Sequence, residues 1–126
     1  MIETPSAVMQ CEEIAKIADF LRIGPGDLSQ FTLGKLRENF LPNEFSRMGF
    51  HTSVIKLIEH VSSVCSKMNT PLSVCLDLEP RRELLFQLLK SGVRSFSVSS
   101  DSVKPTLELL YALTKPSSGR AKGARR

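Results

Sequence analysis

Apolar and polar positions at the start of the chain follow two different periods. Residues 1–3 form a short apolar stub, and from Ser6 the apolar residues follow helical spacing as far as Ala18. Residues 20–23 (FLRI) have a strand-like pattern that stops at two glycines flanking a proline. A second helix is then predicted from Asp27 to about residue 36. This part of the chain therefore predicts two strands, each followed by a helix.

A similar alternation follows an irregular stretch at residues 37–50. A broad apolar face predicts a long helix that ends near Met68, and either Thr52 or Ser53 suits its N-terminal cap. The segment "PLSVCLD" after Asn69 predicts a buried strand. The sequence thus returns to a strand directly after its longest helix.

The C-terminal part of the pattern gives two more helices and one more strand. Pro80 suits the first turn of a helix over "RRELLFQLLK", and Gly92 is placed to end that helix. "RSFSVSS" predicts a fourth strand, and residues 103–114 predict a closing helix. The predicted fold class is α/β, with strands and helices alternating along the chain.

Strands separated by helices run parallel, so their carboxyl ends share one edge of the sheet. In folds built from such repeats, residues just after the strands form the active site. Singly, Glu3 also fits a surface acid, Asp27 a helix cap and Cys75 a small core residue. Together they favour a site. The residues at this edge are Glu3, Asp27, Cys75, Asp77, Ser99, Ser100 and Asp101.

Charge and cysteine content narrow the classes of function. The formal charge is +4, but five of the 17 basic side chains lie in residues 115–126, which hold no acid, leaving 12 basic against 13 acidic side chains in residues 1–114. Nucleic-acid binding would rest on this basic tail alone, which we expect to be disordered. The three cysteines form no paired framework, and neither a membrane span nor a leader is recognised, so we expect a cytoplasmic protein without a membrane partner.

Three motifs carry a family resemblance: "MIETP", "IAKIADFLRIGPGDLSQFTL" and "SVCLDL". In order and spacing they resemble the C-terminal domain of phosphoenolpyruvate (PEP)-utilising enzymes, most closely Enzyme I of the bacterial sugar phosphotransferase system. The likeness covers about residues 1–113. It implies a TIM (β/α)₈ barrel that binds PEP and Mg²⁺ and passes the phosphoryl group to a histidine on another domain.

The resemblance also implies roles for individual residues. Glu3 and Asp27 match the two carboxylates that hold Mg²⁺, a cation that prefers oxygen ligands. Arg37 matches an arginine on the substrate phosphate, and Cys75 matches the thiol that protonates the pyruvate enolate. Gly26 occupies a substrate-binding position at which the family has an asparagine, so the amide is missing here.

The resemblance covers about strands five to eight of the barrel, with residues 1–114 as the partial domain and residues 115–126 as the tail. The expected partners are PEP, the other barrel half and a phosphohistidine domain. We also expect self-association, because open sheet edges and an exposed apolar inner surface are stabilised by contact with a second molecule. Two functions stay open: a truncated or split PEP-protein phosphotransferase, inactive as an isolated chain, or a catalytically degenerate binding or regulatory module. Leu76 and Gly26 favour the second, whereas the retained Glu3, Asp27, Arg37 and Cys75 favour the first.

Overall fold

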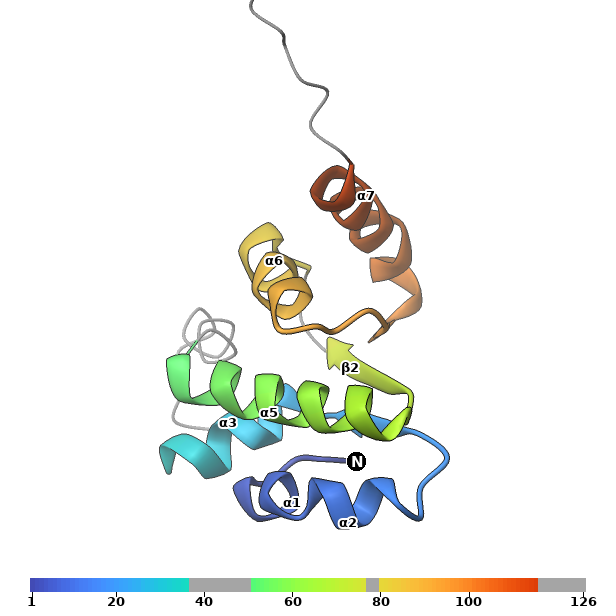
Figure 1. Cartoon of the computed structure of the whole chain (residues 1–126). Helices are drawn as coiled ribbons and strands as arrows, with labels where there is room; N and C mark the ends of the chain where they lie inside the picture. Colours follow the sequence, from blue (N-terminus) through green and yellow to red (C-terminus); the bar gives the residue numbers. More distant parts are fainter. Residues whose placement is uncertain (37–50, 77–79, 116–126) are drawn as a thin grey trace, which may run out of the picture.

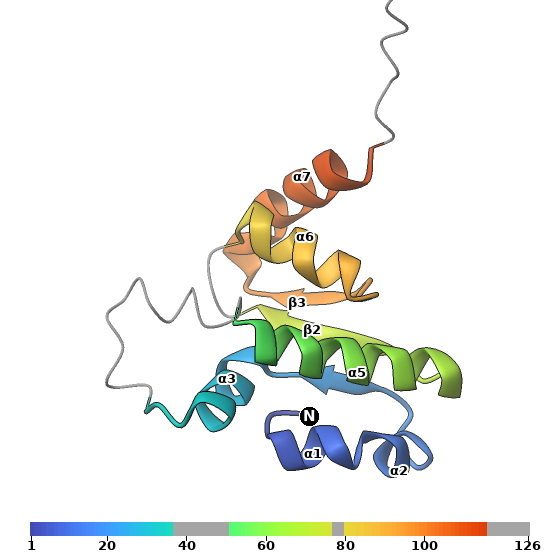
Figure 2. The same cartoon turned by 60° about the vertical axis from the view of Figure 1, so that its left-hand side comes forward.

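A three-stranded parallel sheet forms the centre of the molecule. The computed structural model describes residues 1–36, 51–76 and 80–115. In this part, strands β1 (Leu21–Ile23), β2 (Leu72–Leu76) and β3 (Phe96–Val98) lie side by side in chain order. Figure 2 shows the strands stacked, with α1 and α2 beside the β1 end of the sheet and α6 and α7 beside the β3 end. The predicted α/β class is confirmed.

The N-terminal stub joins this sheet at a single residue. Ile2 forms an isolated parallel bridge with Ile23 of β1. The stub was expected to be a full strand, so the described sheet has three strands and one bridge instead of four strands. The chain leaves the sheet soon after this bridge, because Thr4 is already the N-cap of the helix that begins at Pro5.

The helix predicted from Ser6 to Ala18 is two short helices, α1 (Pro5–Met9) and α2 (Cys11–Ala15). Gln10 separates them, because its backbone (φ −103°, ψ 8°) leaves the helical region. The first helix begins at Pro5, one residue before the predicted opening at Ser6. Thr4 is its N-cap, since the Thr4 hydroxyl accepts a hydrogen bond from the Ala7 N–H at 3.1 Å.

Helix α3 (Pro25–Leu33) begins and ends before the predicted bounds. Proline is favoured at the first helical position, where its missing N–H costs nothing, so the helix starts at Pro25 and Gly24 is the N-cap. Asp27 therefore does not cap the helix. Gly34 ends it with a left-handed backbone (φ 64°), which explains why the helix stops short of residue 36.

Helix α5 (Thr52–Met68) is the longest described helix, as predicted. Its cap is neither Thr52 nor Ser53. The imidazole Nδ1 of His51 accepts a hydrogen bond from the Ser53 N–H at 3.3 Å. Figure 1 shows α5 alongside α3 at the lower part of the molecule.

The last two helices follow the prediction more closely. Helix α6 (Arg82–Lys90) begins after Pro80, which is not in its first turn, and Gly92 with φ 89° follows its end as predicted. Helix α7 (Val103–Thr114) has the predicted bounds and is preceded by the short 3₁₀ helix η2 (Ser100–Ser102). The irregular stretch at 37–50 and the tail from residue 116 lie outside the described residues. No helix in the described ranges is both long and apolar enough to span a bilayer.

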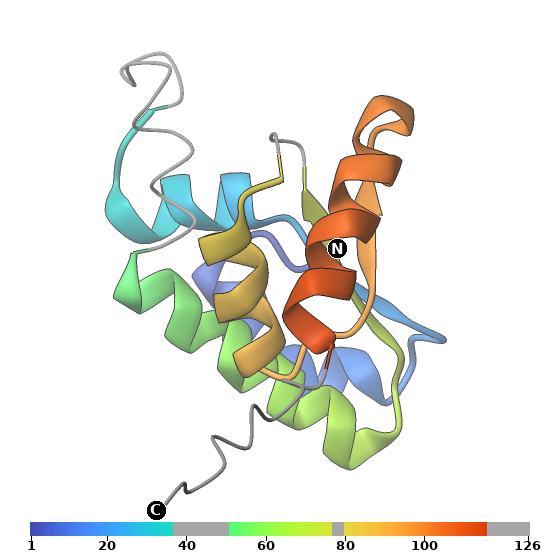
Figure 3. The ribbon, with the colours of Figure 1, turned by 90° about the horizontal axis from the view of Figure 1, so that it is seen from above.

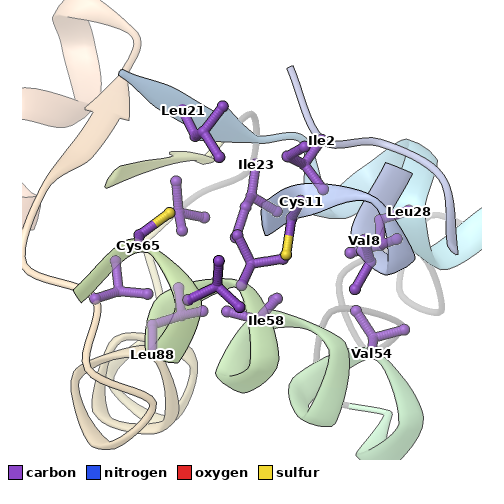
Figure 4. Close-up of a cluster of buried hydrophobic side chains, with 14 of the residues drawn as sticks. Ile2, Val8, Cys11, Leu21, Ile23, Leu28, Val54, Ile58, Cys65 and Leu88 are labelled. Carbon is purple, nitrogen blue, oxygen red and sulfur yellow. The ribbon is translucent and has the colours of Figure 1, made fainter. Parts of the chain in front are cut away.

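One face of the sheet packs against the helices to form the core. Leu21, Ile23, Val74 and Leu76 are buried and cluster with side chains from the helices. Figure 4 shows Leu21 and Ile23 of β1 above Ile58 of α5, with Cys11 and Cys65 among them. Figure 3 shows α5 and α6 next to each other on one side of the strands. Burying each such aliphatic side chain stabilises the fold by about 1.5–3 kcal/mol.

The opposite face of the sheet carries polar or small side chains. Alternate strand residues point to opposite faces, so the partly buried Arg22, Ser73, Cys75 and Ser97 lie away from the helix-packed core. We call these four residues the polar face. An apolar inner surface was expected here, and that expectation is wrong because residues 22, 73, 75 and 97 are polar or small.

Candidate functional site

Backbone hydrogen bonds fix Glu3 beside the end of β1. The Ile2 N–H donates to the Arg22 carbonyl at 2.7 Å, and the Gly24 N–H donates to the Ile2 carbonyl at 3.0 Å. These two bonds hold the stub parallel to β1. Glu3, which directly follows Ile2, is thereby placed next to Gly24, where β1 passes into α3.

The Glu3 side chain lies against Gly24 itself. A Cβ atom added at Gly24 would be 2.6 Å from Glu3 Oε1 and 2.8 Å from Glu3 Cγ. No real Cβ makes contacts this short, so a glycine is needed for Glu3 to lie here. The Glu3 carboxylate is therefore positioned at the N-terminal end of α3.

Asp27 reaches the same end of α3 from inside the helix. It is the acidic residue of the first turn and is half-buried. Its Oδ1 accepts a hydrogen bond from Gln30 Nε2 at 3.0 Å. The partial positive charge of a helix N-terminus stabilises a carboxylate here, so Glu3 and Asp27 bring two acids to the start of one helix.

The donor set of this pair fits Mg²⁺. Carboxylate oxygens are the ligands that Mg²⁺ prefers, and it usually takes one or two carboxylates together with waters and substrate oxygens. Within the described ranges, no group of three or more His, Cys, Asp and Glu side chains could hold a metal ion. A metal here would therefore depend on Glu3, Asp27 and oxygens from outside the described protein.

Strand register aligns Cys75 with Glu3. Ile2 pairs with Ile23, Ile23 with Val74, and Cys75 with Ser97. Continuing this register by one residue puts Glu3, Gly24, Cys75 and Ser97 in one row across the sheet. Neighbouring strands are about 4.8 Å apart, so Cys75 lies roughly 10 Å from Glu3 along the row. A small ligand could contact both side chains.

The remaining predicted residues fall into three groups. Gly26 is half-buried in the first turn of α3, next to Asp27, whereas Arg37 and Asp77 lie outside the described residues. Ser99, Ser100 and Asp101 follow β3 and are exposed. The Ser99 hydroxyl donates to the Ser102 hydroxyl at 3.0 Å, so this segment forms the turn into α7.

The other two cysteines belong to the core, away from the site. Cys11 and Cys65 are buried, with 0% and 2% of their surfaces exposed. Desolvation by burial raises the pKa of Cys11, and burial raises the pKa of Cys65 to about 11. Both thiols are neutral at physiological pH, so these residues pack as small apolar groups.

Arg22 is a polar-face residue that the sequence reading did not select. It is half-buried in the middle of β1, and its Nε donates to the Ser73 hydroxyl on β2 at 3.3 Å. The sequence feature that could have identified Arg22 was its position between Leu21 and Ile23, since alternate residues of a strand face opposite sides of the sheet. The segment FLRI had been read as one apolar strand without regard to its faces.

Comparison with known proteins now decides the family. The family described as "PEP-utilising enzyme, PEP-binding domain" matches residues 1–114. The chain belongs to the PEP-utilising enzymes. The family resemblance seen in the three sequence motifs is thereby confirmed.

Individual relatives support the same placement of this PEP-utilising chain. It is 43% identical over 97 residues to the phosphoenolpyruvate-protein phosphotransferase of Chlamydia trachomatis. The aligned region covers 77% of this chain and 17% of the relative. It is 38% identical over 99 residues to the Chlamydia pneumoniae protein of the same name, covering 79% and 17%. It is also 32% identical over 116 residues to a probable phosphoenolpyruvate synthase of Methanocaldococcus jannaschii, covering 91% and 10%. The chain thus spans between a tenth and a fifth of the length of these relatives.

Proposed function

We propose that the chain is the PEP-binding part of a PEP-protein phosphotransferase of the Enzyme I type, fragmentary or truncated, in the sugar phosphotransferase system. In this role it binds PEP and Mg²⁺, and the phosphoryl group passes to a histidine on another domain. The observation that carries the proposal is the contact of Glu3 with Gly24, which holds one carboxylate at the helix end where Asp27 supplies another. The family membership supports the choice of ligand.

The residues divide the chemistry between them. Glu3 and Asp27 would hold Mg²⁺, which would supply positive charge to neutralise the transferring phosphoryl group. Gly26 leaves room at the substrate, and Arg37 would contact the substrate phosphate through its planar guanidinium. The bond between phosphorus and the enolate oxygen breaks as a bond from the acceptor histidine nitrogen to phosphorus forms.

Cys75 completes the reaction as the proton donor. The enolate left after phosphoryl transfer takes a proton on its methylene carbon and becomes pyruvate. The Cys75 thiol gives up that proton and is left as a thiolate, which solvent reprotonates. Its place in the row of Glu3 and Gly24, on the polar face, supports this role.

Mg²⁺-dependent PEP binding tests the proposal directly. Titration calorimetry of the full chain with PEP is carried out with Mg²⁺ and with EDTA. We expect measurable affinity only with Mg²⁺, and a loss of about tenfold or more in Asp27→Asn, which is the scale of one charge-assisted contact. Asp19→Asn is the matched control, because Asp19 is an exposed acid outside the site.

Two results would contradict the proposal. Equal affinity in wild type and Asp27→Asn would remove Asp27 from the site. Absence of PEP binding with Mg²⁺ would instead favour the second function, a catalytically degenerate binding or regulatory module. Two residues favour this alternative: Gly26, which lacks the amide of the family's asparagine, and Leu76, which stands where the family has a glycine.

We also propose that the sheet is about strands five to eight of a TIM barrel, which requires a second set of strands. These would come from another segment or chain, as would the phosphohistidine domain. The described part of the chain offers β3 as an edge strand, since β3 pairs only with β2 there. Nearby, α7 exposes Val103, Leu107 and Tyr111, with 44%, 60% and 66% of their surfaces accessible.

This edge leads us to propose self-association of the isolated chain. Positions 103, 107 and 111 are spaced along one side of α7, so they form an apolar stripe beside the unpaired edge. Light scattering of the purified chain should show an oligomer whose mass falls in Leu107→Lys. A wild-type monomer at tens of micromolar, roughly the range where exposed edges associate, would overturn the proposal.

A further inference from the structure

Arg22 lies one row deeper in the sheet than the carboxylate and thiol of the candidate site. Two residues along a strand separate Arg22 from Gly24, which corresponds to about 6.6 Å. Arg22 pairs with Ser73 in the register, just as Cys75 pairs with Ser97 one row above. On the polar face, Arg22 and Ser73 therefore lie next to the row that contains Glu3 and Cys75, on its side toward the amino ends of the strands.

The guanidinium of Arg22 has N–H donors that no described residue accepts. Its Nε is directed to Ser73 Oγ, which leaves the two Nη groups without a hydrogen-bond partner in the described part of the chain. The ion pair found there is between Lys16 and Glu13, so no described carboxylate pairs with Arg22. A guanidinium carries a positive charge and a planar fork of N–H donors, so these two Nη groups suit an anionic ligand.

Ser73 adds a donor next to that charge. Its hydroxyl oxygen accepts the hydrogen bond from Arg22 Nε, which leaves the hydroxyl proton to donate elsewhere. Ser97 lies on the neighbouring strand of the same polar face. A planar guanidinium beside hydroxyl groups matches the geometry of a carboxylate.

Depth in the sheet decides which end of a substrate this subsite would take. The phosphoryl end of PEP must lie toward the carboxyl ends of the strands, because it leaves for a histidine outside this sheet. The carboxylate end is not transferred and can reach the deeper row. We propose that Arg22 and Ser73 form a subsite for the carboxylate of PEP and of its product pyruvate, an inference that rests on the proposed function.

Two fragments of the substrate test this assignment on the full chain. Pyruvate has the carboxylate but no phosphoryl group, and inorganic phosphate lacks the carboxylate. With Mg²⁺ present, we expect Arg22→Gln to weaken PEP and pyruvate binding by about tenfold or more while phosphate binding stays unchanged. Arg82→Gln is the matched control, because Arg82 is an exposed arginine at the start of α6.

A measurement on the unmodified chain guards against a folding defect in the variant. The side-chain Nε–H resonance of Arg22 should shift when pyruvate is added, and Arg22→Lys should recover part of the lost pyruvate affinity. Loss of phosphate rather than pyruvate binding in Arg22→Gln would overturn the carboxylate assignment. An unmoved Arg22 resonance, or unchanged pyruvate binding, would overturn it as well.

Asp27→Asn distinguishes failure of this inference from failure of the proposed function. If Asp27→Asn loses PEP binding while Arg22→Gln retains it, Arg22 is not in the site and the proposed function stands. If both variants bind PEP like the wild type, the proposed site is wrong together with its subsite. Absence of wild-type binding to both PEP and pyruvate would also overturn both.

Discussion

The two faces of the sheet are built from alternate residues of the same strands, yet they differ in almost every property. Leu21 and Ile23 are 3% and 0% exposed against the helices, whereas Arg22 between them is half-buried and hydrogen-bonded to Ser73. In β2, Val74 is buried and Cys75 is partly exposed. The difference teaches that stability and chemistry are separated here by a single step along the backbone. A substitution on the helix-packed face should therefore mainly lower stability, whereas one at the adjacent polar-face position should mainly affect ligand binding.

The largest effect is expected on the helix-packed face. Ile23→Ala removes a fully buried side chain from the core and should lower the free energy of unfolding by about 2–5 kcal/mol, measured by urea denaturation. Ser73→Ala, on the polar face, removes one hydrogen bond and should cost no more than about 1 kcal/mol. Similar losses in both variants would break the comparison between the faces.

The next effect concerns pH and the thiols packed under the same helix-packed face. Burial raises the pKa of Cys65 to about 11 from an ordinary value of 9.0. Between these values the unfolded thiol loses its proton before the folded thiol does, so stability is complete below pH 9.0 and falls as pH rises toward about 11. The loss from this group should reach about 2–3 kcal/mol.

Denaturant melts at pH 7 and at alkaline pH measure this loss. The control is Cys65→Ala, which lowers stability at every pH but should have a shallower alkaline decline. Cys11, whose pKa burial also raises, contributes in the same direction and sustains part of the decline in that variant. A wild-type unfolding free energy that stays constant to pH 11 would show that these thiols are not desolvated.

The smallest effect on stability, and the sharpest on binding, is expected at Gly24. In Gly24→Ala the new methyl group would lie 2.6 Å from Glu3 Oε1, so the Glu3 side chain must turn away. A flexible glutamate can do so at a cost of about 1 kcal/mol or less. Mg²⁺-dependent PEP binding should nevertheless weaken by about tenfold, because one of two carboxylates leaves the site.

A double-mutant cycle with Glu3→Ala checks that mechanism. Once the Glu3 carboxylate is gone, Gly24→Ala should add little further loss of PEP affinity. Additive losses from the two substitutions would mean that Gly24 acts on binding through something other than Glu3.

Much of the fold follows from periodicity, because long amphipathic segments leave little choice. The bounds of α7 and the glycine after α6 agree with the sequence reading. Helix starts were less predictable, since Thr4 and His51 gained their capping roles from local side-chain geometry. The break at Gln10 had no signal in the apolar stripe, which continues through both short helices.

The candidate site was predictable in part. Glu3 and Asp27 could be selected as acids after strands, and the fold brings both to the start of α3. The close contact of Glu3 with Gly24 depends on the pairing of the stub with β1, a tertiary feature that no local pattern contains. Arg22 was missed because the segment FLRI was read as one apolar strand, although the alternation of strand residues places Arg22 on the face opposite Leu21 and Ile23.

The hydrogen bond from the Gly24 N–H to the Ile2 carbonyl gives the site a built-in reporter. That amide is protected from exchange with solvent deuterium only while the stub is docked on β1. The exchange rate of this amide therefore measures how often the stub that bears Glu3 undocks from β1. The measurement needs a single spectrum and no ligand. Slow exchange at this one amide would mark a carboxylate already in position before a cation arrives.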